Sequence, residues 1–284
     1  MPAVLATAVI AFALLTVGFA GIATARTYIP SFDAVKKDRG PVFRDGCLIY
    51  TSDVTSPPCH YGVVGSEKKV AVFGDSHALQ WTPALIKVAE RRGWELTMLL
   101  RKNCTAAIVD SDPVCNRWRQ HALRRIEAER STLVFVASNT ASNTFVRRDG
   151  KPLSRTASEP VFRRGMYRGL LRLRRAGAEV TVMRDLPMSR DFVPPVCVSE
   201  NVNHPGRCSF PARRPLAEAY DFAAAKRFKA VQVIDPLPKV CPGRKCRAVE
   251  GNVLKYRDRG HMSATYAVRL TNWLDARLQN PFPG

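Results

Sequence analysis

The chain has 284 residues and a formal net charge of +20 at pH 7. This length is sufficient for one large domain with a filled hydrophobic core, so a second domain is not needed to account for it. The basic excess predicts attraction to anionic surfaces such as phospholipid head groups or acidic cell-wall polymers. It does not define a binding patch, because arginines scattered along solvated helix faces give the same excess.

The first 26 residues form a hydrophobic segment. No charged residue occurs from Pro2 to Ala25, and a run of this length can cross a bilayer as a helix. The segment is either a transmembrane anchor or a signal peptide cleaved after Ala23-Thr24-Ala25. We favour the anchor, because no Lys or Arg precedes the run. The positive-inside rule would then place the basic flank, residues 26–44, in the cytoplasm.

The eight cysteines indicate the opposite compartment. No Cys-x-x-Cys motif occurs and the five histidines do not cluster with the cysteines, so we expect neither a metal site nor another cofactor. Disulfides in an oxidising space outside the cytoplasm fit better, and nucleic acid is not an expected partner there. Eight cysteines allow about 105 connectivities. Nearest-neighbour pairing is our prediction: Cys47 with Cys59, Cys104 with Cys115, Cys197 with Cys208, and Cys241 with Cys246.

Strand-like and helix-like segments alternate over residues 68–284. Residues 27–67, rich in Pro, Asp, Ser and Gly, predict an irregular, disulfide-stapled lead-in that wraps this domain. The alternation favours a three-layer α/β/α flavodoxin-like sandwich with a parallel sheet of about five strands. The proline-rich stretch 186–215 is an excursion long enough to shape a cleft or lid. We expect strands at 70–73, 94–100, 131–137, 179–183 and 230–234, and helices at 77–92, 116–129, 160–176, 216–228 and 264–278.

Ser76 follows the first of these strands. Gly74-Asp75 predicts a tight turn, so Ser76 opens a helix at the carboxyl edge of the sheet, where ligands bind in open α/β folds. The free N–H groups of that first helical turn can face a developing oxyanion. A Gly-Asp-Ser string alone also fits an ordinary turn with a capping serine.

A serine nucleophile needs a base and a group that orients the base. His261 lies in the turn before the last helix, at the same sheet edge as Ser76, and Asp258 precedes it by three residues. His77 is interpreted as a residue of the first helical turn or of the cleft, pointing away from Ser76. The remaining histidines are expected at the surface: His60, His121 and His204.

A family resemblance strengthens this pairing. The string Gly74-Asp75-Ser76-His77-Ala78-Leu79-Gln80-Trp81, together with Asp258-Arg259-Gly260-His261, resembles the SGNH (GDSL-like) hydrolase superfamily. More narrowly, the chain from Cys47 onward is similar to the extracytoplasmic SGNH domain fused to membrane acyltransferases of family 3, which modify bacterial surface glycans. The resemblance implies that Ser76 is the nucleophile, His261 the base and Asp258 its orienting acid. It also implies that the N-terminal segment is the last membrane helix of such a protein, which would place the domain outside the cell.

The chain departs from the superfamily pattern at the oxyanion hole. Most members carry Gly-x-Asn-Asp after the third strand, whereas this chain has Ser138-Asn139-Thr140 and a second candidate, Asn143. We expect Asn139 and the Ser76 amide to be the oxyanion donors, with Asp75, His77 and Asn143 as further cleft residues. The oxyanion glycine after the second strand is also absent, since Arg101-Lys102-Asn103-Cys104 stands there.

Two functions remain open. The first is a serine esterase or O-acyltransferase that removes or transfers an acetyl or other acyl group on a bacterial cell-surface glycan through an acyl-serine intermediate. The second is a catalytically weak, glycan-binding SGNH-like module that assists a membrane acyltransferase. Both predict an acylated glycan or acyl donor as partner, and a location on the extracytoplasmic face of the membrane, anchored or secreted. A metal-dependent hydrolase is disfavoured, because clusters of metal ligands are lacking.

Overall fold

The computed structural model describes residues 26–140, 146–148, 151–212 and 219–282. The hydrophobic run ending at Ala25 lies outside them, as does Asn143. Over these described ranges, none of the helices has the length and apolar character required to cross a membrane.

A parallel sheet forms the centre of the molecule, as the alternating pattern predicts. Its strands lie in the order β1-β4-β3-β5-β8-β10, and the five predicted strands are all present in it. Each starts and ends within two residues of the prediction, because buried apolar runs with β-branched residues mark these strands clearly. The five are β3 (Lys69–Gly74), β4 (Glu95–Arg101), β5 (Leu133–Ala137), β8 (Glu179–Met183) and β10 (Val231–Ile234).

The lead-in does more than wrap the domain, in contrast to the prediction from its composition. Strand β1 (Leu48–Ile49) pairs parallel to β4, and β2 (His60–Gly62) pairs antiparallel to the same strand. Leu48 and Cys47 belong to the main hydrophobic core. The Cys47–Cys59 disulfide joins the two short strands, which explains how an otherwise irregular segment holds its place on the sheet. Two short helices precede them, α1 (Phe32–Val35) and α2 (Pro41–Arg44).

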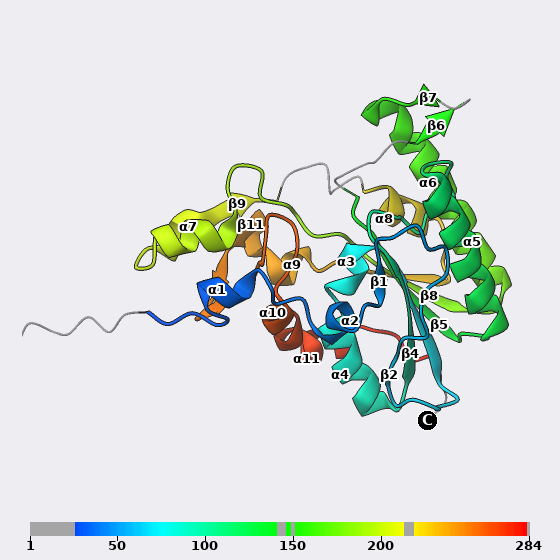
Figure 1. Cartoon of the computed structure of the whole chain (residues 1–284), viewed down its shortest axis with the longest axis horizontal. Helices are drawn as coiled ribbons and strands as arrows, with labels where there is room; N and C mark the ends of the chain where they lie inside the picture. Colours follow the sequence, from blue (N-terminus) through cyan, green and yellow to red (C-terminus); the bar gives the residue numbers. More distant parts are fainter. Residues whose placement is uncertain (1–25, 141–145, 149–150, 213–218, 283–284) are drawn as a thin grey trace, which may run out of the picture.

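Helices cover both faces of the sheet (Figure 1). Alternate β3 residues point to opposite faces: Val70 and Val72 belong to one core, Ala71 and Phe73 to the other. On the first face lie α4 (Thr82–Arg92), α10 (Ala264–Arg269) and α11 (Thr271–Asp275), and on the second α5 (Pro113–Ala128), α6 (Arg155–Arg175) and α8 (Tyr220–Ala225).

Helix boundaries differ from the prediction. The first helix is divided into α3 (Ser76–Leu79) and α4, since Pro83 starts a new helix there. The last is divided into α10 and α11 at Leu270. Helix α6 starts at Arg155 rather than at Pro160, and a small hairpin, β6 (Arg147–Arg148) with β7 (Lys151–Pro152), precedes it.

The proline-rich excursion forms a projection beside the sheet, with α1 packed against it (Figure 1). It contains α7 (Pro194–Glu200), a 3₁₀ turn (Pro205–Cys208) and β9 (Ser209–Pro211). Strand β9 pairs with β11 (Lys245–Arg247), which follows α9 (Leu237–Val240) and a second 3₁₀ turn (Pro242–Arg244). The hairpin of β12 (Val249–Glu250) and β13 (Val253–Leu254) completes this part of the chain.

The four nearest-neighbour disulfides are all present, which confirms the predicted pairing: Cys47–Cys59, Cys104–Cys115, Cys197–Cys208 and Cys241–Cys246. Both cysteines of the second pair are buried, Cys115 in the first turn of α5. This pair fixes the segment that leads from β4 to α5, close to the edge of the sheet where Ser76 lies.

We expect peptide mapping under non-reducing conditions to recover these four bridges. Replacing the second pair as Cys104→Ser/Cys115→Ser should lower the free energy of unfolding by about 2–4 kcal/mol, because the loop regains its freedom in the unfolded chain. Urea unfolding measures this change. Free thiols throughout the untreated protein would contradict the pairing and the oxidising compartment together.

Candidate active site

The turn between β3 and α3 presents Ser76. Gly74 has φ +153°, and a Cβ atom there would lie 1.8 Å from the Ala137 carbonyl oxygen, so only glycine fits between β3 and β5. Asp75 then caps α3, its carboxylate accepting a hydrogen bond from the His77 amide at 2.8 Å. The strand therefore ends abruptly and directs the serine hydroxyl above the carboxyl edge of the sheet.

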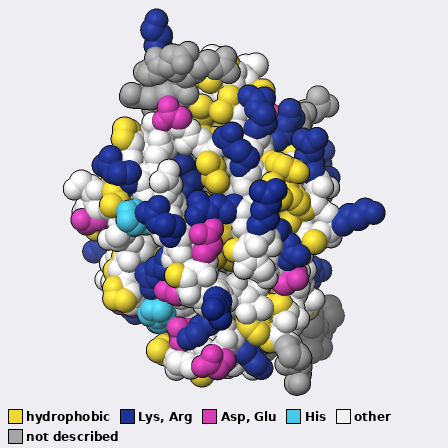
Figure 2. Space-filling model, turned by 90° about the vertical axis from the view of Figure 1, so that its right-hand side faces the viewer, with side chains coloured by type: hydrophobic (Ala, Val, Ile, Leu, Met, Phe, Trp, Pro, Cys, Tyr) yellow, Lys and Arg dark blue, Asp and Glu magenta, His cyan; other side chains and the backbone are white. Residues whose placement is uncertain are grey.

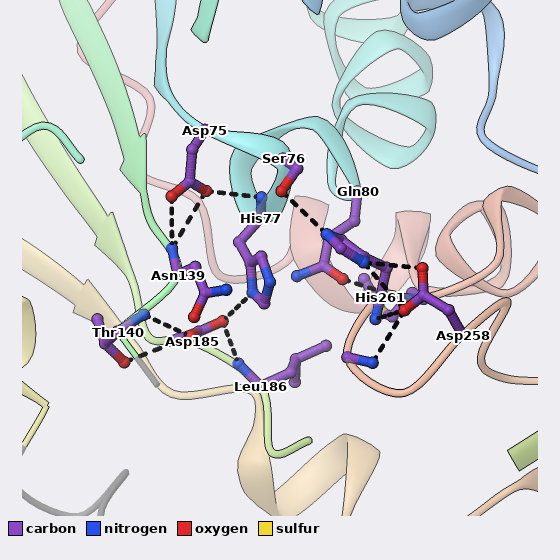
Figure 3. A network of polar contacts seen from close by, with 12 residues as sticks. Asp75, Ser76, His77, Gln80, Asn139, Thr140, Asp185, Leu186, Asp258 and His261 are labelled. Atoms are coloured by element: carbon purple, nitrogen blue, oxygen red, sulfur yellow. Dashed lines mark hydrogen bonds and ion pairs between the residues drawn. The ribbon is translucent and has the colours of Figure 1, made fainter. Parts of the chain in front are cut away.

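A chain of hydrogen bonds joins Ser76, His261 and Asp258 (Figure 3). The distance from His261 Nε2 to Ser76 Oγ is 2.9 Å. On the other side of the ring, Nδ1 lies 2.9 Å from both carboxylate oxygens of Asp258. The structure thus brings together three residues that the sequence singles out, two of them 185 positions apart.

The loop that carries His261 is held from two sides. The Asp258 carboxylate accepts hydrogen bonds from the amides of Gly260 and His261, at 2.9 and 2.8 Å. The Met262 amide donates to the side-chain oxygen of Gln80 at 2.9 Å. Gln80 lies at the end of α3, so it ties this loop to the helix that begins with Ser76.

The surroundings of His261 favour its neutral form. Burial lowers the pKa of its imidazole to about 4, and the charges of His77 and Arg257 act in the same direction against the hydrogen bond to Asp258. Burial alone would raise the pKa of Asp258, but the hydrogen bond from His261 and the charge of Arg257 hold it below its usual range. At neutral pH the pair is therefore an ionised carboxylate and a neutral imidazole.

A second histidine–aspartate pair lies beneath the first. His77 Nδ1 is 2.5 Å from Asp185 Oδ1, and both side chains are buried. The ring of His77 also contacts the ring of His261, with centroids 4.6 Å apart. Burial alone would lower the pKa of His77, but the carboxylates of Asp185 and Asp75 raise it above the ordinary value, which favours a positive charge next to His261.

These buried carboxylates also position the end of β5. Asp75 accepts the Asn139 amide at 2.9 Å, and Asp185 accepts the Thr140 amide at 2.8 Å. Burial raises the pKa of Asp75 to about 6, so its capping role is strongest above that pH. Asn139, the predicted oxyanion residue, is thereby fixed next to the turn that carries Ser76.

Asp75 and His77 do not line the cleft, contrary to the prediction. They are 2% and 1% exposed, so they lie beneath the site. The reason is local: the Asp75 carboxylate is occupied by two amides, and the His77 side chain faces Asp185 in the interior. His77 lies in the first turn of α3, one of its two expected places, and its ring also contacts the ring of His261. The third predicted cleft residue, Asn143, lies outside the described residues.

Sequence reasoning missed Asp185 and gave Gln80 no role. Asp185 follows the end of β8, and a carboxylate directly after a buried parallel strand is a signal that could have identified it. Gln80 gave no such signal, because its contact depends on where the C-terminal loop returns. Within the described ranges, no group of three His, Cys, Asp or Glu residues is arranged to hold a metal ion.

The fold is a parallel α/β sheet with hydrogen-bonded Ser, His and Asp residues at its carboxyl edge. This arrangement is typical of proteins built like serine hydrolases. A family model described as the SGNH domain (fused to AT3 domains) matches residues 44–275. The chain belongs to this family, whose relatives in the wider SGNH group are in general esterases or acyltransferases.

One solved structure shows the same fold, and a second matches with a lower TM-score. The periplasmic domain of a lipopolysaccharide acetyltransferase from Salmonella ser. Paratyphi A matches with a TM-score of 0.60 and 13% identity, over 75% of this chain and 84% of that one. A carbohydrate acetylesterase from Sinorhizobium meliloti matches with a TM-score of 0.44 and 14% identity, over 74% of this chain and 97% of that one. No curated protein sequence matches the chain.

The two histidines make a testable electrostatic pair. We expect the His261 imidazole to titrate near pH 4 in an NMR titration, below the ordinary value of about 6.5. In His77→Gln the pKa of His261 should rise, because the neighbouring positive charge is removed while a side-chain donor to Asp185 is kept. His121→Gln, which changes a distant histidine, should leave it unaltered. An unchanged His261 titration in His77→Gln would contradict the coupling.

Proposed function

We propose that this domain is a serine esterase or O-acyltransferase that acts on an acylated glycan through an acyl-Ser76 intermediate. The observation that carries the proposal is the pair of 2.9 Å contacts that link the Ser76 hydroxyl to His261 and His261 to Asp258. A serine becomes a useful nucleophile only when a neutral base accepts its proton, and the low pKa of His261 keeps that base neutral at physiological pH.

The first half-reaction forms the acyl-enzyme. His261 Nε2 accepts the Ser76 proton while Oγ attacks the ester carbonyl carbon, and the ionised Asp258 stabilises the resulting imidazolium. When the tetrahedral intermediate collapses, the bond to the leaving alcohol breaks and His261 returns its proton to that oxygen. The acyl group is then bound to Ser76.

The second half-reaction decides between an esterase and a transferase. His261 deprotonates either water or a sugar hydroxyl, which attacks the acyl-Ser76 carbonyl. Collapse then releases an acid or a new ester and returns the proton to Ser76. The oxyanion formed in each half-reaction would be bound by the Ser76 amide, which opens the first turn of α3, and by Asn139.

Glycan chemistry outside the cytoplasm is the setting we propose. Four disulfides favour an oxidising compartment, and the family is described as fused to AT3 domains, so a membrane acyltransferase is the partner we expect to supply the acyl group. The Salmonella domain of the same fold comes from a lipopolysaccharide acetyltransferase, which suggests an acetyl group and a surface glycan here. The hydrophobic segment of residues 1–26 would hold the domain at the outer face of the membrane.

A glycan-binding module with little catalysis is the second candidate. The chain carries Ser138-Asn139-Thr140 after β5 where most SGNH enzymes have Gly-x-Asn-Asp, which favours this alternative. In that case the domain would hold the acceptor glycan for the membrane acyltransferase, and Ser76 would form no acyl-enzyme.

Ser76→Ala should lower the rate of hydrolysis of 4-nitrophenyl acetate by at least about 10³-fold, because no acyl-enzyme can form. Ser199→Ala, at a distant exposed serine, serves as the control and should keep full activity. Mass spectrometry of the wild-type protein should detect an acetyl group on Ser76. Absence of wild-type turnover together with retained glycan binding would support the binding module instead.

Asn139→Ala should lower kcat by about 10²–10³-fold with little change in KM, because an oxyanion donor acts mainly in the transition state. The matched control is Asn203→Ala, at an exposed asparagine in the projection. Unchanged kcat in Asn139→Ala would show that another group binds the oxyanion.

A further inference from the structure

A groove runs between α5 and α6, on the face of the sheet opposite α4 and α10. It has a volume of about 580 Å³. Its lining is partly apolar, with Ile108, Leu171 and Ala176, and it also includes Arg168, Arg172, Arg175 and Glu127. Figure 2 looks onto this side of the molecule, where Lys and Arg side chains gather, mainly in the upper right, with apolar side chains between them and fewer acidic side chains.

The groove is built on a fixed segment. Residues 105–109 pack tightly on α6 at Gly165, where a Cβ atom would lie 2.5 Å from the Ile108 carbonyl oxygen. The Ile108 amide donates to the Gly165 carbonyl at 3.0 Å. The buried Arg119 donates to the carbonyls of Thr105 and Val109 at 2.9 and 3.1 Å, and the Cys104–Cys115 disulfide closes the loop. One end of the groove is therefore rigid.

The arginines are arranged in a line along α6. Residues 164, 168, 172 and 175 are spaced by three or four positions, so their side chains lie on one side of the helix over roughly 16 Å. Arg168 donates to the Ile108 carbonyl at 2.8 Å, and Arg172 forms a double contact with Glu127 at 2.6 and 2.9 Å. The charge of Glu127, the one acidic residue in the lining, is thus balanced by Arg172. Arg164, Arg168 and Arg175 are exposed.

We propose that this groove binds an anionic glycan chain, one that carries phosphate or carboxylate groups. Guanidinium groups bind both anions through paired hydrogen bonds, and their regular spacing suits a ligand with repeated charges. A concave groove with a partly apolar lining fits an extended polymer, whose sugar rings have apolar faces, better than it fits a flat bilayer surface.

The groove lies along the C-terminal half of α6, and its Ile108 end is the end nearer the candidate active site. Helix α6 runs from the carboxyl edge of the sheet to the opposite edge, because it connects two parallel strands, β5 and β8. At that carboxyl edge, the Ala106 amide donates to the hydroxyl of Ser138, the residue before Asn139. A glycan longer than the groove could pass from its Ile108 end toward the reacting end. This last step rests on the proposed function, whereas binding in the groove does not.

Binding can be tested without turnover. The probe is fluorescently labelled polygalacturonate, a carboxylate-bearing glycan, with neutral dextran of equal length as the comparison, in about 0.15 M salt. We expect Arg168→Gln/Arg175→Gln to weaken polygalacturonate binding by about tenfold, because two charge-assisted contacts are lost. The matched control is Arg207→Gln/Arg247→Gln, which removes the same charge from the projection and should bind like the wild type. Equal unfolding temperatures of the two variants would exclude a folding effect.

Three outcomes would overturn the proposal. The first is equal weakening by both double variants, which would show that only net charge matters. The second is binding of dextran as tight as that of polygalacturonate. The third is tighter binding of anionic phosphatidylglycerol vesicles than of polygalacturonate, through the same two arginines. This result would show that the groove binds a lipid surface. Repeating the titration with Ser76→Ala separates the two proposals, since lost turnover with retained binding concerns only the catalytic one.

Discussion

Two buried carboxylates, Asp75 and Asp185, hold the ends of three neighbouring strands in one arrangement. They accept the successive amides of Asn139 and Thr140, so the chain leaving β5 is fixed between the end of β3 and the end of β8. Burying a carboxylate is unfavourable unless hydrogen-bond donors replace water. Here backbone amides and the His77 ring supply those donors. The positions of Ser76, of Asn139 and of the His77 ring all depend on these hydrogen bonds to the two carboxylates.

The pKa of His261, the proposed base, is set by burial and by three neighbours that act in opposite directions. His77 and Arg257 disfavour a proton on His261, whereas the carboxylate of Asp258 favours it. A base with a low pKa is available under acidic conditions but accepts a proton from serine less readily. Asp258 compensates once the imidazolium has formed, because it already lies within 2.9 Å of Nδ1. The structure thus combines a base that stays neutral with a partner that stabilises its charged form.

The sequence predicts most of the sheet and the Ser76–Asp258–His261 set for a common reason. Buried strands such as Val70–Phe73 are continuous apolar runs, and parallel topology places the residues that follow them at one edge. The disulfides were predictable because cysteines close in the chain need little loop closure. The contact between His77 and Asp185 was not, since it joins residues 108 positions apart and local patterns carry no such information. Strands of two or three residues, β1 and β2, are too short for periodicity to reveal.

The separation of Ser76 from His261 along the chain has a consequence for biosynthesis. The four disulfides close short loops, with partners 5 to 12 residues apart, so each can form as soon as its own segment is available. Ser76 and His261 are 185 positions apart and can meet only when nearly the whole chain has arrived. A chain still being synthesised therefore carries Ser76 without His261, and the hydrogen-bonded set with Asp258 can form only after residue 261 has been added.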